Sequence, residues 1–387
     1  MNKKNSLSLY LHIPFCRHRC SYCDFNTYTS LSDLKNAYAA ALVTEIEQVA
    51  GNVKRPFHTL FFGGGTPSLM SPASLKAILT AVHVNFTQTA NAEISMEANP
   101  GTVDEAYLTA VHAIGINRIS FGVQSVIPSE LALLEREHDF EAVIQAVAAT
   151  HAAGINNINL DLIYGVPGQT MASWEKSVHA VLALQPQHLS FYCLTIEPGT
   201  PMHRWKENGR FPPPDPDLAA DQYEKASQIL AAAGYIQYEI SNWALPGYEC
   251  EHNLTYWRNG DYLGLGAGAH GHANGMRYHV VKQPRVYVRR LQNGQQAQYP
   301  LSTAVSDSHH IDPTEAMSDT IITQLRLLQE GVDLAAFEAQ FGQSLDAAYN
   351  GTVAQLMELN LLQIKNNRLL LTENGRFISN QVFYRFM

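Results

Sequence analysis

Tyr10-Leu-His-Ile-Pro-Phe-Cys16 runs directly into Arg17-His-Arg-Cys20-Ser-Tyr-Cys23 near the start of this 387-residue chain. A short apolar strand therefore delivers three cysteines with the spacing C-x3-C-x2-C. Three thiolates this close together can hold three irons of a cubane iron–sulfur cluster and leave the fourth iron open to a small molecule. Two other interpretations use the same residues. A zinc knuckle would usually recruit a further Cys or His at similar spacing, and His18 lies inside the loop. A disulfide would leave an odd thiol.

Composition places the chain among ordinary globular proteins. It is 46% apolar and 16% charged, and its length suits two to three domains. Its net charge is 26 − 35 = −9, so we expect no general attraction to nucleic acid or anionic lipid. The N-terminus lacks the features of a signal peptide, and no window approaches about 18 uninterrupted apolar residues. We expect a cytoplasmic protein, in a compartment reducing enough to keep cluster thiols free.

Short apolar strands alternate with helical segments through the first half of the chain. The expected strands are residues 7–13, 59–62, 93–97, 118–123, 157–164 and 188–194. Helix signals between them include Ser71-Pro72 as a start, a capping box over 102–105, and Gly51, Gly115 and Gly154 as stops. Six successive βα units predict an α/β fold with a parallel sheet, closed or partly closed into a (β/α)6 barrel of the TIM type. The loops that follow the strands should build the active site.

The pattern changes after residue 194. We expect a helix over 217–233, a strand over 235–240, a glycine-rich strand over 264–271 and a polar linker over 293–310. From 312 onward, helices lead into strands at 361–364 and 368–371, an order that resembles a winged helix. These segments predict three units, a barrel over 1–215, an extension with additional strands over 216–300, and a winged-helix-like domain over 311–387.

Polar and glycine residues gather where the barrel strands end. Gly63-Gly64-Gly65 allows the backbone to approach a zwitterionic or anionic ligand closely. Glu97 and Asp161 lie at or near strand ends, where carboxylates can accept hydrogen bonds from ribose hydroxyls. Gln124 and Arg136 follow the fourth strand, and Arg136 suits a carboxylate. Each of these residues alone could be structural, but together beside three cysteines they indicate a site for S-adenosylmethionine.

Four longer motifs carry a family resemblance. They are YLHIPFC at 10–16, FGGGTPS at 62–68, FGVQS at 121–125 and NLDLIYGVPGQ at 159–169. The chain resembles the radical S-adenosylmethionine (radical SAM) superfamily, in the branch that contains oxygen-independent coproporphyrinogen III oxidase. The resemblance implies that Cys16, Cys20 and Cys23 bind a [4Fe–4S] cluster whose open iron is chelated by the methionine part of the cofactor. The residues that match the family's cofactor contacts are Tyr10, Gly64, Gly65, Thr66, Glu97, Gln124, Arg136 and Asp161.

Two departures separate the chain from the oxidases of that branch. The oxidases carry a further cysteine two residues after the third, where this chain has Phe25, and they have a longer N-terminal arm. The chain is instead similar to the HemW family of heme chaperones, whose HNxxYW motif matches residues 252–257. This resemblance implies heme binding, with the His252 imidazole as iron ligand and Tyr256 and Trp257 as flat apolar surface. The structural alternative is that His252 and Asn253 cap a helix while the aromatic residues fill a core.

Other residues with ligand chemistry have simpler explanations. Cys250 could be a thiolate ligand or a small buried apolar side chain. Cys193 ends a barrel strand and should be core, and the His309-His310 pair should only be solvated.

The expected function is a heme chaperone that carries a [4Fe–4S] cluster and S-adenosylmethionine and passes heme to an acceptor protein whose identity the sequence does not give. The first alternative is an oxygen-independent coproporphyrinogen III oxidase. A nucleic-acid binder is the second, but residues 311–387 hold five Lys/Arg against nine Asp/Glu, a net of 5 − 9 = −4, which is the wrong sign for DNA. We therefore expect neither a nucleic-acid partner nor insertion into a membrane.

Overall fold

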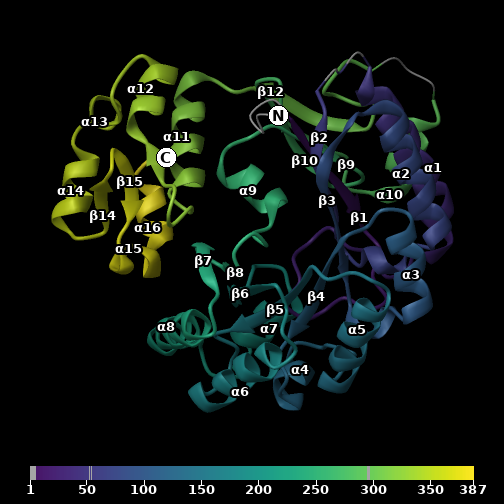
Figure 1. Ribbon diagram of the computed structural model, residues 1–387, viewed down its shortest axis with the longest axis horizontal. Helices are drawn as coiled ribbons and strands as arrows, with labels where there is room; N and C mark the ends of the chain where they lie inside the picture. Colours follow the sequence, from purple (N-terminus) through teal and green to yellow (C-terminus); the bar gives the residue numbers. More distant parts are fainter. Residues whose placement is uncertain (1–5, 52, 54, 294–296) are drawn as a thin grey trace.

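A large mixed sheet wrapped by helices forms most of the molecule, and a small C-terminal unit packs beside it (Figure 1). The computed structural model describes residues 6–387 apart from 52, 54 and 294–296. The first six strands are β1 (Leu7–Ile13), β2 (Phe57–Gly64), β3 (Gln88–Ala98), β4 (Arg118–Gln124), β5 (Ile158–Tyr164) and β6 (His188–Cys193). They pair in parallel and in chain order, which confirms the six expected βα units.

Helices connect these strands along the outer face. They are α1 (Lys35–Ala50), α2 (Pro72–Asn85), α3 (Glu105–Ala113), α4 (Pro128–Leu133), α5 (Phe140–Ala152), α6 (Met171–Leu182), α7 (Pro201–Glu207) and α8 (Pro216–Ala232). Ser71 begins α2 as expected, because its hydroxyl accepts the Ser74 N–H and Pro72 takes the first helical position. Gly51 ends α1, and Gly115 and Gly154 follow the ends of α3 and α5 with positive φ.

The parallel strands are extended on both sides. β9 (Tyr262–Leu265) pairs in parallel with β1, and β10 (His270–Ala273), β11 (Met276–Val280) and β12 (Val305–His310) continue antiparallel beyond it. On the other side β8 (Asn242–Ala244) pairs with β6, and β7 (Ile236–Glu239) pairs with β8. The order runs from β12 to β7, so the sheet is an open, partial barrel with added strands, as the sequence predicts.

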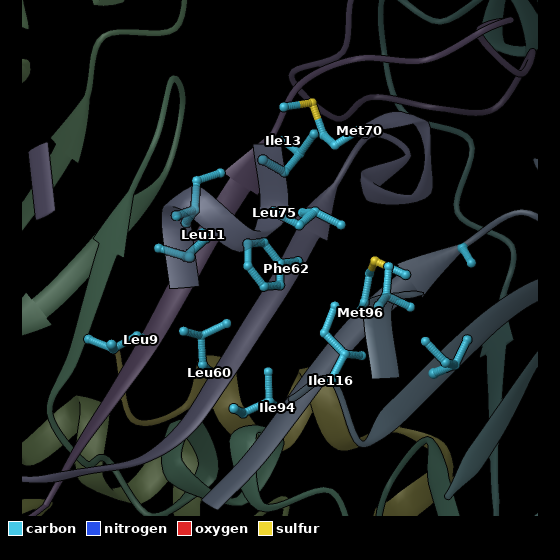
Figure 2. Close-up of a cluster of buried hydrophobic side chains, with 14 of the residues drawn as sticks. Leu9, Leu11, Ile13, Leu60, Phe62, Met70, Leu75, Ile94, Met96 and Ile116 are labelled. Carbon is cyan, nitrogen blue, oxygen red and sulfur yellow. The ribbon is translucent and has the colours of Figure 1, made fainter. Parts of the chain in front are cut away.

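Alternation along the strands separates a helix-facing core from the barrel interior. Figure 2 shows Leu9, Leu11 and Ile13 of β1 packed beside Leu60 and Phe62 of β2. Ile94 and Met96 of β3, Leu75 of α2, and Met70 and Ile116 from the connections complete this cluster, and all ten are at most 1% exposed. Burying each such side chain stabilises the fold by about 1.5–3 kcal/mol. Because successive side chains alternate, the residues between them point into the barrel.

Two expected segments in the second half are corrected. The polar stretch 293–310 is not a linker throughout, because 305–310 forms β12 and pairs with β11 from Met276↔His310 to Val280↔Val305. A polar strand at the edge of a sheet has no apolar alternation to reveal it. Residues 294–296 lie outside the described part of the chain, and α10 (Pro284–Leu291) precedes them.

The glycine-rich segment 264–271 is two strands rather than one. It breaks between β9 and β10 at Gly266 and Gly268, whose φ angles are +95° and +88°. A Cβ atom on Gly266 would lie 2.5 Å from the His12 carbonyl oxygen, so the close approach to β1 excludes a side chain. The capping box expected over 102–105 is also wrong. Asp104 caps α3 by accepting the Tyr107 N–H, and Thr102 belongs to a short 3-10 turn (Pro100–Thr102).

The C-terminal unit has its own core. Its elements are α11 (Pro313–Gln324), β13 (Val332–Asp333), α12 (Leu334–Phe341), α13 (Leu345–Ala348), α14 (Thr352–Glu358), β14 (Leu362–Lys365), β15 (Arg368–Leu371), α15 (Glu373–Phe377) and α16 (Ser379–Tyr384). Helices followed by the β14–β15 hairpin agree with the expected order, and β13 adds a third strand.

The short helix α9 (Glu251–Trp257) lies between this unit and the barrel (Figure 1). In the described part of the chain, no helix is both long and apolar enough to cross a membrane.

Candidate cofactor site

A cavity of about 550 Å³ opens at the carboxyl ends of the parallel strands and runs into the barrel. Parallel barrels place their sites at this end, because the loops that follow the strands converge there. The cavity is large enough for a small cofactor. Twelve of the residues that the sequence nominated line it: Cys16, Cys20, Cys23, Tyr10, Gly64, Gly65, Thr66, Glu97, Gln124, Arg136, Asp161 and His252. Trp257, expected as a surface for heme, does not line it; its ring centroid lies 4.2 Å from the Arg326 guanidinium carbon, and the ring packs against a small apolar cluster.

The three cysteines stand at the rim of this cavity as free thiols. All five cysteines of the chain are free, which excludes the disulfide alternative. The Thr66 hydroxyl donates to Cys16 Sγ at 3.5 Å, and Arg136 Nη1 donates to Cys20 Sγ at 3.5 Å. Among the residues that the structure describes, no three Cys, His, Asp or Glu side chains converge to share a single metal ion. Thiolates that bind separate irons of a cluster need no such convergence, so the cysteine loop suits a cluster.

The glycine loop after β2 brings backbone to the edge of the cavity. Gly64 has a φ of +114°, and its N–H donates to Glu97 Oε2 at 2.9 Å. A Cβ atom on Gly65 would lie 2.7 Å from the Phe15 carbonyl oxygen and 3.1 Å from Cys16 Sγ. Glycine is therefore required at Gly65 for the loop to pass the cysteine strand, and at Gly64 because of its φ.

Two half-buried carboxylates line the cavity. Burial raises the pKa of Glu97 to about 7, with a smaller contribution from Asp161 and an opposing one from the Gly64 N–H. Burial also raises the pKa of Asp161, although hydrogen bonds from Asn159, Ser190 and Ser120 oppose it. Ionising either side chain therefore costs free energy in this cavity, and a ligand with hydroxyl donors or a positive charge would lower that cost.

Arg136 is fixed in place and still has a donor to offer. Its Nη2 donates to Asn99 Oδ1 and to the Gly122 carbonyl oxygen, both at 2.7 Å. Its buried Nε has no hydrogen-bond partner in the described part of the chain. A buried donor without a partner is rare in a folded protein, so it suits a ligand carboxylate. Gln124 reaches the same region from a left-handed backbone conformation, with a φ of +68°.

Several polar residues inside the barrel were not predicted. They are Arg118 and Ser120 of β4, Asn159 of β5, and Ser190 and Tyr192 of β6, all of which line the cavity. Asn159 Nδ2 donates to Ser120 Oγ and to Asp161 Oδ1, both at 2.7 Å. A signal was present in the sequence, because these residues recur every second position along strands whose other positions are apolar.

The helix α9 contributes His252 and Tyr256 to the cavity wall. His252 is 1% exposed and stacks on Phe61, with ring centroids 5.1 Å apart. Its Nδ1 lies 2.8 Å from Thr59 Oγ1 and its Nε2 lies 2.8 Å from the Tyr256 hydroxyl, so both ring nitrogens are engaged. Burial lowers the pKa of His252 to about 3. The helix-cap alternative is wrong, because His252 lies within α9 and Cys250 occupies the capping position without a side-chain bond.

The structure also places the remaining cysteines, Cys250 and Cys193, and the exposed histidine His309. Cys250 is buried, and burial raises its pKa to about 12, which favours the small buried side chain over a thiolate ligand. Cys193 is not core, because the last two residues of β6 are exposed and Cys193 lines the cavity. His309 is exposed but not merely solvated, since its Nε2 lies 3.0 Å from Glu315 Oε1.

Comparisons with known proteins agree with this site. The radical SAM superfamily matches residues 10–181, and the HemN C-terminal domain matches residues 311–378. A protein of Mycobacterium tuberculosis named heme chaperone HemW is 36% identical over 97% of this chain and 93% of its own length. A Bacillus subtilis protein with the same name is 34% identical over 98% of this chain and 99% of its own length. The chain belongs to the HemW family. It is thereby a radical SAM protein, and this membership implies a [4Fe–4S] cluster and S-adenosylmethionine, as the sequence predicts.

The HemW family fold is shared with a solved oxidase. The structure described as coproporphyrinogen III oxidase (HemN) from Escherichia coli, a radical SAM enzyme, matches 99% of this chain and 90% of its own with a TM-score of 0.84. The two sequences are 24% identical, so this likeness concerns the fold alone.

Proposed function

We propose that this chain binds heme and passes it to acceptor proteins, while it carries a [4Fe–4S] cluster and S-adenosylmethionine. The observation that carries the proposal is the similarity, over nearly the full length, to proteins named heme chaperone HemW. The cavity geometry supports the cofactor part. Three free thiols and the nominated polar residues line one space at the mouth of the barrel.

Different residues of the cavity would bind the cluster and S-adenosylmethionine. Cys16, Cys20 and Cys23 would hold the cluster, which would supply an iron with an open coordination position. The Arg136 Nε would donate to the carboxylate of S-adenosylmethionine, because no protein group in the described chain uses it. Glu97 and Asp161 would accept hydrogen bonds from the ligand, and the glycine loop would admit it against the backbone.

The heme site belongs beside α9 in this proposal. His252 and Tyr256 line the cavity and belong to the motif shared with the family, and the other aromatic rings nearby supply flat apolar surface. A reducing compartment such as the cytoplasm would keep the three thiols available for the cluster. The acceptor would be a protein that receives heme.

We also propose three structural units. The barrel spans 1–215, and the extension begins at 216. The pairing of β11 with β12 supports an extension that reaches 310 rather than 300. The winged-helix-like unit spans 311–387, and a separate cluster of buried residues such as Ile321, Leu356 and Val382 supports it as a unit.

Absorbance spectroscopy on the anaerobically reconstituted chain tests the proposal. We expect hemin to bind saturably with a Soret band distinct from that of free hemin, and the same protein with excess S-adenosylmethionine and reductant to leave coproporphyrinogen unchanged. The Cys23→Ala variant is the matched control, because it should lose the cluster and keep hemin binding. Absence of saturable hemin binding refutes the chaperone function. Conversion of coproporphyrinogen would establish the oxidase alternative.

A further inference from the structure

A second cavity of about 320 Å³ lies on the other side of Tyr10. It is bordered by β1, α9, β9 and the start of β10, and it is lined by Tyr10, His12, Phe25, Asn26, Tyr256, Tyr262, Gly268, His270 and Lys282. Three of these residues, Tyr10, Phe25 and Tyr256, also line the cofactor cavity, so the two spaces are neighbours with a shared aromatic wall. Of the residues that line the second cavity, the sequence links only Tyr10 and Tyr256 to a ligand.

The walls of this second cavity suit a flat apolar macrocycle. Tyr256 and Tyr262 meet edge to face, with ring centroids 4.6 Å apart and an interplanar angle of 79°. Phe25 stands at the rim with 64% of its side chain exposed, although a large aromatic residue is ordinarily buried. Aromatic faces and edges of this kind pack well against a conjugated ring.

His270 is the imidazole in this cavity that remains available to a metal. It is the first residue of β10, it is exposed, and within the described chain no hydrogen bond engages its ring. His12 differs, since its Nδ1 lies 3.0 Å from the Tyr10 hydroxyl and its Nε2 lies 3.1 Å from the Asn26 carbonyl oxygen. His252 is likewise engaged through both nitrogens, so it could bind iron only by giving up Thr59 or Tyr256.

Charge and protonation around His270 agree with a metal ligand. Partial burial, followed by the nearby His279, Lys282 and Arg277, lowers the pKa of His270 and so favours the neutral imidazole. A neutral imidazole can offer a lone pair to iron without first losing a proton. Lys282 is exposed at the rim, where its ammonium group can meet a carboxylate.

Resting on the proposed function, we propose that heme binds in this second cavity with His270 as its axial ligand and Lys282 beside a propionate. His252 then acts as a positioning residue, because its hydrogen bond holds the Tyr256 hydroxyl and so fixes the shared wall. The macrocycle rests on the rings of Tyr256 and Tyr262. Cargo at this exposed rim can leave for an acceptor, whereas the deeper cavity remains free for the cluster and S-adenosylmethionine.

Titration of the full, reconstituted chain with hemin and with metal-free protoporphyrin IX tests this assignment. Removal of groups that merely orient a metal ligand costs about 10–100-fold in metal affinity, so loss of the ligand should cost at least about tenfold. We expect His270→Ala to weaken hemin binding by that factor, to shift the Soret band, and to leave protoporphyrin affinity unchanged. Added imidazole should restore the band. Tyr262→Ala should weaken both porphyrins alike.

Two further histidine variants, His279→Ala and His179→Ala, separate contact with the ligand from general loss of an imidazole. Because His279 stacks on His270 with ring centroids 5.6 Å apart, His279→Ala tests support of the ligand, and His179→Ala, which removes an exposed imidazole of α6 that lines neither cavity, should leave hemin binding unchanged. His252→Gln, which keeps hydrogen-bonding capacity toward Thr59 and Tyr256, should retain the wild-type Soret position. If His270→Ala binds hemin with wild-type affinity and spectrum, the assignment is wrong while the chaperone function stands. If His252→Gln alone abolishes the band, His252 is the ligand. Failure of the wild-type chain to bind hemin would overturn both proposals.

Discussion

Replacing Glu97 with Gln should make the cofactor-free protein more stable at alkaline pH while weakening cofactor binding. The Glu97 carboxyl group is enclosed by the barrel, and burial is the main reason that its pKa rises from 4.5 to about 7. The folded state therefore holds this proton more tightly than the unfolded chain does. Between these two pH values the unfolded chain loses the proton first, so the free energy of unfolding falls as the pH rises.

The size of the change in the free energy of unfolding follows from the rise in the pKa of Glu97. A rise in pKa from 4.5 to about 7 corresponds to about 3 kcal/mol of stability that is present below pH 4.5 and lost by about pH 7. Gln cannot ionise and can still accept the Gly64 N–H. We therefore expect Glu97→Gln to match the wild type near pH 4.5 and to exceed it by about 3 kcal/mol at pH 8.

Urea denaturation of the cofactor-free chain at both pH values measures the difference. Glu105→Gln, the same change on an exposed side chain of α3, is the control. Calorimetry on cluster-loaded protein should show the opposite sign, with S-adenosylmethionine bound more weakly by about 1–3 kcal/mol in Glu97→Gln, because a ligand donor loses its charged partner. If Glu97→Gln is less stable than the wild type at pH 8, or if the difference does not change with pH, the argument from burial fails.

Three further predictions concern the cluster, the domain contact and the second cavity. Alanine at any one of the three motif cysteines should abolish [4Fe–4S] loading in an iron and sulfide assay, whereas Cys193→Ala should leave it intact; equal iron loss from Cys193→Ala would contradict the three-ligand assignment. Arg326→Leu should lower the free energy of unfolding by about 3 kcal/mol, because it leaves the fully buried Glu239 carboxylate without its ion-pair partner at 3.4 Å. Adding Glu239→Gln to this variant should recover most of the lost stability, because it removes the unpaired charge. Gly264→Ala would place a Cβ atom 1.7 Å from the His270 carbonyl oxygen, so it should disrupt the β9–β10 region and hemin binding, while Gly101→Ala, with open space around it, should do neither. A normal hemin titration for Gly264→Ala would show that β10 is not needed there.

The barrel could be predicted because its strands carry local signals. Apolar residues at alternate positions of β1, β2 and β3 mark a sheet covered by helices, and Ser71-Pro72 and the helix-ending glycines mark where helices begin and end. The cysteine loop and the strand-end residues could be predicted for a related reason. Parallel strands bring their carboxyl ends to one edge, so Glu97 and Asp161 line the same cavity although they are far apart in the sequence.

The missed features depend on contacts that no local pattern encodes. β12 is polar and lies at the sheet edge, so its sequence has the pattern of a linker. The two engaged nitrogens of His252 come from Thr59, 193 residues away, and from Tyr256 on the same helix. The sequence does not show whether the ring nitrogens of a histidine are hydrogen-bonded. Every histidine therefore looks equally suited to bind iron until the fold is known. Only the fold distinguishes His252 from His270.

The shared wall of Tyr10, Phe25 and Tyr256 has a thermodynamic consequence. A ligand in either cavity touches rings that also bound the other cavity, so the free energy of holding those rings in one arrangement enters both binding equilibria. Linkage is reciprocal: if S-adenosylmethionine changes the affinity for heme by some factor, heme must change the affinity for S-adenosylmethionine by the same factor. Binding of S-adenosylmethionine in the deeper cavity would therefore change the affinity of the second cavity for heme. Loss of heme would in turn change the affinity of the deeper cavity for S-adenosylmethionine.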